Sequence, residues 1–599
     1  MGGKNGYFRF GARVVRGRWF MLFGAMLIMC GSGQTYIYST YSKAIQTTLG
    51  YDGEEMDIIT FCRDVAAYVA IFGGLVCEVA PSWVVLLIGA VLNFGGFIMT
   101  WLAVMHKIQR PPAWQTGVYV ALGTASPNFA HTIALATCVK NFPESRGVVL
   151  GLMKGLVGLN AAIFTQIYLG FYANDPRGLI LVTAVFPTIF YLGFMFTIRT
   201  IEADRQPNEL REFLNFFYLT IVLALFLMIM TLLDKYIVVT RNGHVIGAAV
   251  VFILLLLPLY LVIKQEAALS KLETHDHLNY PTRDEVSAID KKPQASAAPQ
   301  QEHNTPSSSV SCFANIFKKP ERGEDHSILQ AVFSVDMVYI FFITLCGYGT
   351  GLTAYDHFGR LGQALAKRER LVSSIVSLVS IWNYYGRVYS GFLSELLLLK
   401  WKVPRSIVST VMLVLQSIGL LLFAYPEIPG AYYVASVTLG FTLGAQVPIY
   451  LAIISEFFGL KYYATLLNFA QLYCPLALYL MNTKFTRVIY AKEAIKDVIA
   501  QGKDPALVKD PVCEGSHCYR LSFSILALIA FIGALISLKF ASRTREFYKG
   551  DLYKKFRNEN RRDGDMLIRR FGGEKYMKFG EAQGKAISET QMAQHCNKR

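Results

Sequence analysis

The stretch NFPESRGVVLGLMKGLVGLNAAIFTQIY, Asn141–Tyr168, begins with polar and charged residues and continues into glycines and aliphatic residues. Its apolar part is long enough to cross a bilayer, because about 20 apolar residues span the hydrocarbon layer as a helix. Lys154 lies within this apolar run, eight residues beyond Arg146. A charged side chain inside a membrane helix is costly and usually faces the protein interior or a watery cavity.

Helix geometry places Lys154 beside a stripe of small residues. Gly147, Gly151 and Gly155 recur at every fourth position, which lets another helix approach closely. Lys154 lies about 20° from Gly147 around the helix axis. We therefore expect Lys154 to face protein and to contact a substrate anion or a carboxylate on a facing helix. The alternative is that its ammonium group snorkels to the cytoplasmic surface.

The rest of the chain repeats this apolar pattern. Hydrophobic residues make up 53% of the 599 residues and charged residues only 17%. Only helices could span a membrane at these lengths. The sequence thus predicts an all-α polytopic membrane protein of about 14 spans. The predicted spans are residues 19–41, 56–79, 83–105, 114–139, 147–172, 178–199, 214–233, 245–264, 331–354, 371–396, 405–425, 430–457, 462–489 and 521–541.

The spans divide the chain into six parts. The predicted parts are a basic cytoplasmic N-terminus (1–18), a first six-helix domain (19–200), two additional helices (214–264), a linker (265–328), a second six-helix domain (329–542) and a basic cytoplasmic tail (543–599). The linker is rich in Ser, Pro, Gln and charge, which predicts disorder. The basic tail is expected to meet anionic lipid headgroups.

The net charge of +16 fits a membrane protein better than a nucleic-acid-binding one. The basic residues form no stripe with interleaved aromatic residues, and they flank the apolar spans instead. Lysine and arginine beside spans mark the cytoplasmic side, so both termini are expected in the cytoplasm, with the protein in the plasma membrane or an endomembrane. The basic segment 359–370 is an exception to this charge pattern, because the predicted number of spans places it on the outer side of the membrane.

The two halves of the chain share landmarks. A Gly-x-x-x-Glu motif ends the second span of each half, as Gly74 to Glu78 in GLVCE and Gly391 to Glu395 in GFLSE. FPESR opens the fifth span of the first half, and FFGLK opens its counterpart. The two offsets, 395 − 78 = 317 and 457 − 142 = 315, are nearly equal. A duplicated six-helix unit explains this, and transporters are commonly built from such repeats.

These stretches resemble known sequences. The Gly-x-x-x-Glu element is similar to a degenerate form of the cytoplasmic loop motif of the major facilitator superfamily. RWFMLFGAMLIMCGSGQTYIYSTYSKAI and the opening stretch resemble the plant nodulin-like branch, which includes the nuclear-fusion-defective type, and CGYGTGLTAYDHFGRLGQAL and SIWNYYGRVYSGFLSE resemble its C-terminal half. The resemblance implies the major facilitator fold, here two six-helix pseudo-repeats with two extra helices between them, and a membrane carrier. It names no substrate.

A more distant similarity concerns Arg387 in NYYGRVYSG. Monocarboxylate carriers and oxalate/formate antiporters of this superfamily place an arginine in the corresponding helix to hold a substrate carboxylate. The resemblance implies that role for Arg387, and a structural ion pair near the cytoplasmic mouth is the alternative. Monocarboxylate carriers also have an aspartate one turn earlier, where this chain has Asn383. Proton coupling through that acid is therefore in doubt.

Other polar residues within spans are candidates for substrate binding or gating. Asp64 could carry a coupling proton, or form an outer-gate ion pair with Arg63 or a lysine elsewhere. His131 and Asn128 are three residues apart and therefore share a helix face. The hypothesis for His131 is that it binds a ligand or a proton, and the alternative is that it only packs against neighbouring helices. Interhelical hydrogen bonds are the alternative for the remaining candidates, which are Gln34, Tyr38, Asn160, Gln166, Gln446, Asn468 and Gln471.

The ten cysteines are scattered and show no zinc-binding spacing. Cys513 and Cys518, in CEGSHC, lie in a polar loop before the last span, where a disulfide would form if the loop faces an oxidising compartment. No nucleophile motif, metal spacing or nucleotide loop is present in the sequence. We therefore expect no metal, no cofactor and no enzymatic activity.

Together these patterns predict a secondary carrier that uses alternating access. Its partners would be the lipid bilayer and a small solute, with an organic anion as the candidate and protons as candidate coupling ions. We expect a monomer that binds no nucleic acid. Two alternatives remain open, a non-transporting receptor or regulator on a carrier scaffold and, less supported, an intramembrane enzyme.

Overall fold

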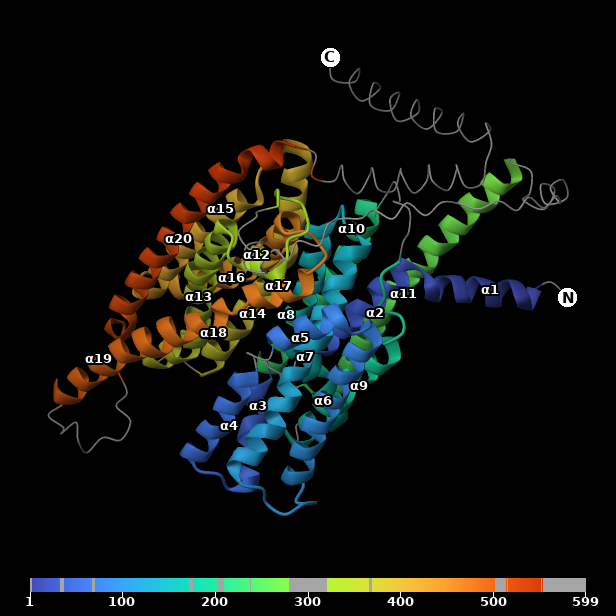
Figure 1. Ribbon diagram of the computed structural model, residues 1–599. Helices are drawn as coiled ribbons and strands as arrows, with labels where there is room; N and C mark the ends of the chain where they lie inside the picture. Colours follow the sequence, from blue (N-terminus) through green and yellow to red (C-terminus); the bar gives the residue numbers. More distant parts are fainter. Residues whose placement is uncertain are drawn as a thin grey trace, which may run out of the picture. The chain divides into compact units, whose positions relative to one another are not determined.

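A computed structural model describes residues 3–32, 37–66, 70–172, 176–201, 209–236, 239–279, 320–365, 369–500, 513, 515–550 and 552. Within these residues every regular element is a helix (Figure 1). The helices belong to one compact unit of residues 1–203 and 207–549. The second unit, residues 204–206 and 550–599, lies almost wholly outside the described residues. The predicted all-α class is confirmed.

The first half holds nine helices in the described part of the chain. They are α1 (Gly3–Arg16), α2 (Arg18–Gly31), α3 (Tyr38–Leu49), α4 (Gly53–Ala66), α5 (Ala70–Val79), α6 (Ser82–Val104), α7 (Ala113–Asn141), α8 (Arg146–Tyr172) and α9 (Pro176–Phe194). Pro81 and Pro112 stand directly before α6 and α7 with φ near −65°. Proline suits such a start because its φ is already fixed and it has no backbone N–H to leave unsatisfied.

Two helices, α10 (Glu209–Tyr236) and α11 (Arg241–Asn279), follow the first half. The second half contains α12 (Ile328–Val332), α13 (Val335–Ala364), α14 (Glu369–Trp401), α15 (Arg405–Ala424), α16 (Ala431–Phe457), α17 (Tyr463–Ala470), α18 (Tyr473–Ala477), the π-helix η3 (Leu478–Thr486), α19 (Arg487–Ala500) and α20 (His517–Lys549). The predicted order of six spans, two spans and six spans stays a prediction, because the described helices do not correspond one to one with the predicted spans.

The predicted number of about 14 spans is not confirmed. Among the described residues, 11 helices are long and apolar enough to cross a membrane, or up to 12 if the bent pair of α1 and α2 is one span. The helices α7 and α14 have 29 and 33 residues but are not among the 11. Length therefore permits them to cross, while their polar content keeps their mean hydropathy low.

Three predicted spans are not single helices in the described residues. The span predicted at 56–79 is divided between α4 and α5, with residues 67–69 outside the described residues. The span predicted at 19–41 is divided between α2 and α3, with residues 33–36 outside the described residues. The span predicted at 462–489 is divided among α17, α18, η3 and the start of α19, with a break at Gln471 and Leu472. Hydropathy identifies a run of apolar residues, but it does not show where a helix within that run breaks or changes direction.

Part of the predicted disordered linker is helical. The helix α11 continues past the predicted span end at Lys264 to Asn279. Residues 280–319 lie outside the described residues. The end of the linker packs on the second half, because the backbone N–H groups of Gly323 and His326 donate to the carbonyl oxygens of Phe457 and Phe458. Likewise α20 runs to Lys549, beyond the predicted domain end at residue 542.

Candidate functional site

The two halves meet where α8 and α14 run side by side (Figure 1). A Cβ atom on Gly391 of α14 would lie 2.5 Å from the carbonyl oxygen of Gly147 and 2.7 Å from the Cα atom of Gly151. Only glycine allows the two backbones to approach this closely. The glycine stripe seen in the sequence is therefore the contact surface of α8 with the other half.

Glu395 joins the halves at the first turn of α8. One of its carboxylate oxygens accepts a hydrogen bond from the backbone N–H of Gly147 at 2.9 Å and pairs with the Arg405 guanidinium at 2.8 Å. Arg405 also pairs with Glu456 at 2.7 Å. All three charged side chains are buried. A helix start favours a carboxylate because its free N–H groups carry partial positive charge.

Glu78 repeats this arrangement in the other direction. Its carboxylate accepts a hydrogen bond from the backbone N–H of Thr465, in the first turn of α17, at 3.3 Å. A Cβ atom on Gly74 would lie 2.8 Å from the Cα atom of Thr465. Each Gly-x-x-x-Glu motif thus places its glutamate at the start of a helix of the opposite half. We call the end of the bundle where α5 and α14 end and α8 and α17 begin the locked end.

The basic partner of the second motif comes from α15. Three basic residues follow the motif in the sequence, Lys400, Lys402 and Arg405, and Arg405 is the one that pairs with Glu395. The triad with Glu456 was missed by sequence reasoning. A glutamate at the end of an apolar span, next to FFGLK, was the available signal.

Arg387 and Lys154 come together between the halves. The Arg387 Nη1 atom donates a hydrogen bond to the backbone carbonyl oxygen of Lys154 at 2.9 Å. Arg387 is 4% exposed and Lys154 is 8% exposed, so neither side chain snorkels to a surface. Among the described residues, the Lys154 ammonium has neither a carboxylate nor a hydrogen-bond partner. Lys154 is thus a buried cation that faces protein.

His131 completes a group of three basic side chains. The charges of both Lys154 and Arg387 act on its imidazole. Its buried Nε2 atom has no hydrogen-bond partner among the residues that the structure describes. In the described part of the chain, the charges that act on Lys154 and His131 come from basic groups. We call Lys154, Arg387 and His131 the basic cluster; it draws on α7 and α8 of the first half and α14 of the second.

A chain of amide and hydroxyl groups also connects the halves. The Asn468 Nδ2 atom donates to the Thr132 hydroxyl at 2.9 Å, and the Gln471 Nε2 atom donates to the Asn468 Oδ1 atom at 3.2 Å. Thr132 follows His131 on α7, and Asn468 lies on α17. Both predicted candidates, Asn468 and Gln471, therefore lie at the contact between the halves.

Other candidates make their hydrogen bonds and ion pairs with residues outside the basic cluster. The Asn128 side chain donates to the Ala66 carbonyl oxygen within the first half at 3.1 Å. Arg63 pairs with Asp64, its neighbour in sequence, and its guanidinium lies 4.2 Å above the Tyr38 ring. These groups form a local contact between α3 and α4. Gln34 lies outside the described residues.

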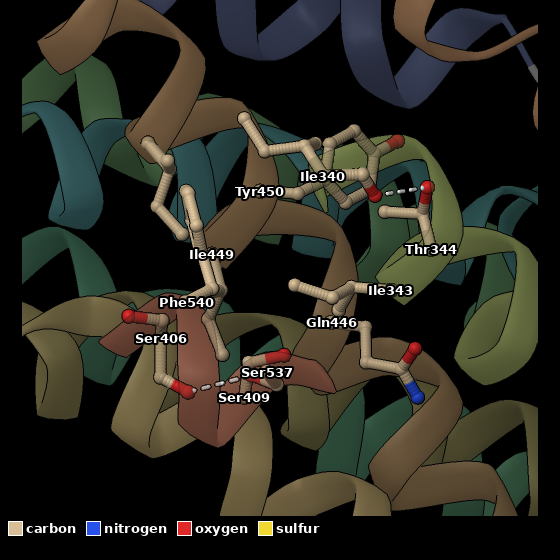
Figure 2. A pocket seen from close by; sticks show the side chains of 11 residues that line it. Ile340, Ile343, Thr344, Ser406, Ser409, Gln446, Ile449, Tyr450, Ser537 and Phe540 are labelled. Carbon is tan, nitrogen blue, oxygen red and sulfur yellow. Dashed lines mark hydrogen bonds between the residues drawn. The ribbon is translucent and has the colours of Figure 1, made fainter. Parts of the chain in front are cut away.

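Asn383 and Gln446 belong to the interior of the second half. The backbone of Asn383 packs against Gly444 of α16, and the Gln446 side chain donates to Gln416 of α15. Gln446 also lines a small pocket whose labelled side chains come from α13, α15, α16 and α20 (Figure 2). This pocket is mostly apolar and lies within one half, so it is a weaker candidate for a transport site than the basic cluster.

Two buried amides of α8 are also incompletely bonded. Within the described part of the chain, both polar side-chain atoms of Asn160 lack a hydrogen-bond partner, although the residue is fully buried. Gln166 donates to Asp234 of α10 at 3.2 Å, while its Oε1 atom has no partner in the same residues. Burying an amide group without a hydrogen-bond partner costs free energy. A solute or a water molecule that bonded to these two amides would remove that cost.

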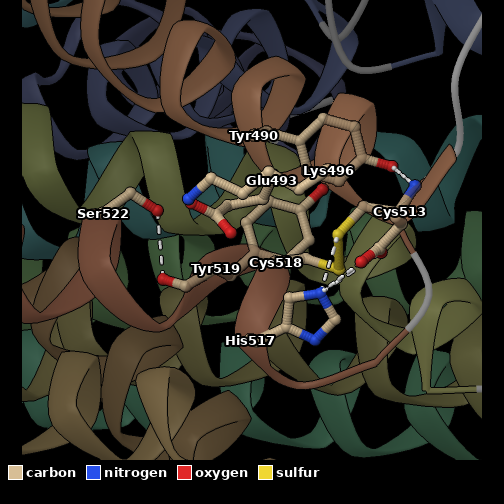
Figure 3. Close-up of a disulfide and its surroundings, with 9 residues drawn as sticks. Tyr490, Glu493, Lys496, Cys513, His517, Cys518, Tyr519 and Ser522 are labelled. Atoms are coloured by element: carbon tan, nitrogen blue, oxygen red, sulfur yellow. Dashed lines mark hydrogen bonds and ion pairs between the residues drawn. A yellow bond between two sulfur atoms is a disulfide. The ribbon is translucent and has the colours of Figure 1, made fainter. Parts of the chain in front are cut away.

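Cys513 and Cys518 form a disulfide between the end of the α19–α20 connection and the first turn of α20 (Figure 3). The six cysteines at residues 30, 62, 77, 138, 346 and 474 are free thiols.

The fold and the paired motifs define a polytopic membrane protein of the major facilitator superfamily. The structure of the proton:xylose symporter XylE bound to 6-bromo-6-deoxy-D-glucose superimposes with a TM-score of 0.50 at 13% identity, covering 87% of this chain and 95% of that chain. A double-tryptophan XylE mutant gives a TM-score of 0.51 at 12% identity with the same coverage. XylE is a protein of E. coli. At these identities the likeness shows the fold.

The family follows from the sequence matches. The nodulin-like family model matches residues 18–263, and the model described as the NFD4 C-terminal domain matches residues 327–550. The protein NUCLEAR FUSION DEFECTIVE 4 of Arabidopsis thaliana is 20% identical over 538 residues, or 89% of each chain. The chain belongs to the nodulin-like family of the major facilitator superfamily, and it is an integral, multi-pass membrane protein.

Proposed function

We propose that the protein is a secondary carrier that moves a small organic anion by alternating access between its two halves. The basic cluster supports this proposal most directly. Lys154 and Arg387 are buried cations from opposite halves, and in the described residues the Lys154 charge has no carboxylate to balance it. A carboxylate substrate would supply the missing charge and could accept hydrogen bonds from both groups.

The position of the cluster suits a carrier. It lies between α7, α8 and α14, so a bound anion would contact both halves at once. Carriers of this kind bind their solute at the interface of the repeats and rock the halves around it. XylE is a proton:xylose symporter, and xylose is a neutral sugar. The buried positive charge here favours an anion over a neutral sugar.

The locked end would be the closed mouth in this state. The Glu395 bond to Gly147 and the Glu78 bond to Thr465 both cross between the halves, so both must break for that mouth to open. We propose that the locked end faces the cytoplasm, because the basic N-terminus and tail are expected on that side. Protons are the candidate coupling ion.

Uptake into proteoliposomes tests the proposal. Labelled monocarboxylates, dicarboxylates and neutral sugars would be compared at equal gradients, with and without a pH gradient. We expect uptake of at least one carboxylate and none of the sugars. Lys154→Gln should reduce that uptake about tenfold or more, because a lost charge-assisted contact is worth roughly 1.5–3 kcal/mol.

Lys43→Gln is the matched control, since Lys43 is an exposed lysine of α3 and should transport like the parent protein. Uptake of sugars with no uptake of carboxylates would overturn the anion assignment. Binding of a carboxylate without any flux would instead favour a receptor on a carrier scaffold.

A further inference from the structure

The first turn of α20 gathers four residues of types that bind metals in proteins. Their metal-binding atoms are the sulfur atoms of Cys513 and Cys518, the His517 imidazole nitrogen and a carboxylate oxygen of Asp497 on α19. One ligand atom of each residue lies within 4.8 Å of the others. The His517 Nε2 atom lies 3.0 Å from an Asp497 carboxylate oxygen and 3.7 Å from the Cys513 sulfur. Figure 3 shows the imidazole directed at the pair of cysteines.

We propose that these four residues form a redox-controlled zinc site. In the present state the two sulfurs are joined as a disulfide and cannot act as thiolate ligands. After reduction, two thiolates, one imidazole nitrogen and one carboxylate oxygen would surround a single position. Zn²⁺ prefers four such ligands in a tetrahedron at about 2.0–2.3 Å, which sets neighbouring ligand atoms about 3.3–3.8 Å apart. The observed spread of the four groups needs only small side-chain shifts to reach these values.

The chemistry balances in two steps. A dithiol reductant supplies two electrons and two protons to the Cys513–Cys518 disulfide and leaves as its own disulfide, which gives two thiols. Zn²⁺ then displaces one proton from each thiol, and two zinc–thiolate bonds form. In the reverse direction a small-molecule disulfide accepts two electrons from the two thiolates and leaves as two thiolates of its own, which re-forms the Cys513–Cys518 disulfide and releases Zn²⁺. The two soft sulfur ligands favour zinc over magnesium or calcium.

The surroundings already hold the ligands in place. The backbone N–H of Cys513 donates to the Tyr490 hydroxyl at 3.2 Å, and the Tyr490 ring stacks on Tyr519 at 5.1 Å between centroids. Both cysteines are fully buried, whereas the His517 side chain is 46% exposed. An ion could therefore enter from the His517 side while the sulfurs stay in position. Groups that orient ligands in this way raise metal affinity.

The site lies away from the locked end. The other end of α20 reaches Glu456, because the Tyr548 hydroxyl donates to the Glu456 carboxylate at 2.8 Å. Its first turn, with His517 and Cys518, is therefore at the opposite end of a helix of 33 residues. In either state the site would tie α19 to α20, by a disulfide with an ion pair or by a metal. The inference does not depend on which solute the protein carries.

Metal binding to the purified full-length protein tests the proposal. The protein is reduced with a phosphine, freed of reductant without oxygen, and titrated with Co²⁺ and Zn²⁺. We expect one Zn²⁺ per chain by elemental analysis, and with Co²⁺ the charge-transfer absorption typical of thiolate ligands. The unreduced protein should show neither. Zinc should also protect both thiols of this site from alkylation, as read by mass spectrometry.

Three variants separate this site from the other thiols. His517→Ala keeps both cysteines and should weaken zinc binding by about tenfold or more, as loss of groups around a metal typically does. Asp497→Asn should do the same. Cys474→Ser removes a free thiol elsewhere in the second half and should leave binding unchanged. Zinc binding that is equal in His517→Ala and the parent, or absent from the reduced parent, would overturn the proposal.

Discussion

At the scale of single residues, the buried position of Lys154 is central to the proposed anion site. A lysine in an apolar run could have snorkelled, yet its side chain is 8% exposed and its own backbone carbonyl accepts a hydrogen bond from Arg387. Helix geometry alone was enough to predict that Lys154 faces protein. The partnership with Arg387 could not be predicted from the sequence, because 233 residues separate the two.

Arg405 has the clearest energetic role of any single residue at the locked end. It lies between Glu395 and Glu456 and is fully buried. Arg405→Gln would leave two buried carboxylates without their cation, which typically costs about 3–5 kcal/mol. We expect a clearly lower melting temperature for this variant in detergent.

The control for Arg405→Gln is Arg520→Gln. This variant breaks the ion pair of Arg520 with Glu427, which lies in the second half like Arg405. That pair is largely exposed, and exposed pairs contribute about 0–1 kcal/mol. Equal melting temperatures for the two variants would contradict the assigned importance of the buried triad.

At the scale of elements, the crossing of α8 and α14 matters most. Repeated sequence landmarks predicted two matching units, and the paired motifs place glutamates at the first turns of α8 and α17. The sequence could not show which helices these glutamates would contact, since nothing in a motif specifies a distant partner. It also misplaced the end of α11, because the charged segment KQEAALSKLE lacks apolar length but consists mainly of helix-favouring residues.

Gly391→Ala tests the crossing directly. Its new methyl group would lie 2.5 Å from the Gly147 carbonyl oxygen, so α8 and α14 would have to separate. Overpacking of this kind typically costs about 1–3 kcal/mol. We expect a lower melting temperature and slower transport, measured on the same preparation.

Gly95→Ala in α6 provides the comparison, because a Cβ atom there meets nothing within 4 Å. Alanine favours a helix over glycine, so this variant should be as stable as the parent or slightly more stable. If Gly391→Ala behaved like Gly95→Ala, the close approach of the two helices would not hold in the membrane.

At the scale of the whole molecule, apolar length was enough to predict an all-helical membrane protein. The major facilitator fold was implied only by the resemblance of the motifs. The number of spans was harder to predict from the sequence, because α7 and α14 carry polar residues that lower their mean hydropathy. Those polar residues include His131 and Arg387 of the basic cluster. The two helices that are hardest to recognise as spans therefore supply two of the three residues of the basic cluster, while Lys154 comes from α8.

Solute counterflow tests alternating access at the basic cluster most directly. Proteoliposomes are loaded with an unlabelled carboxylate and diluted into a trace of the same labelled anion, without any ion gradient. A carrier should accumulate the label transiently above its equilibrium level, and Lys154→Gln should abolish this overshoot while Lys43→Gln retains it. A parent protein that takes up the anion without overshoot, or an overshoot unchanged in Lys154→Gln, would contradict the account.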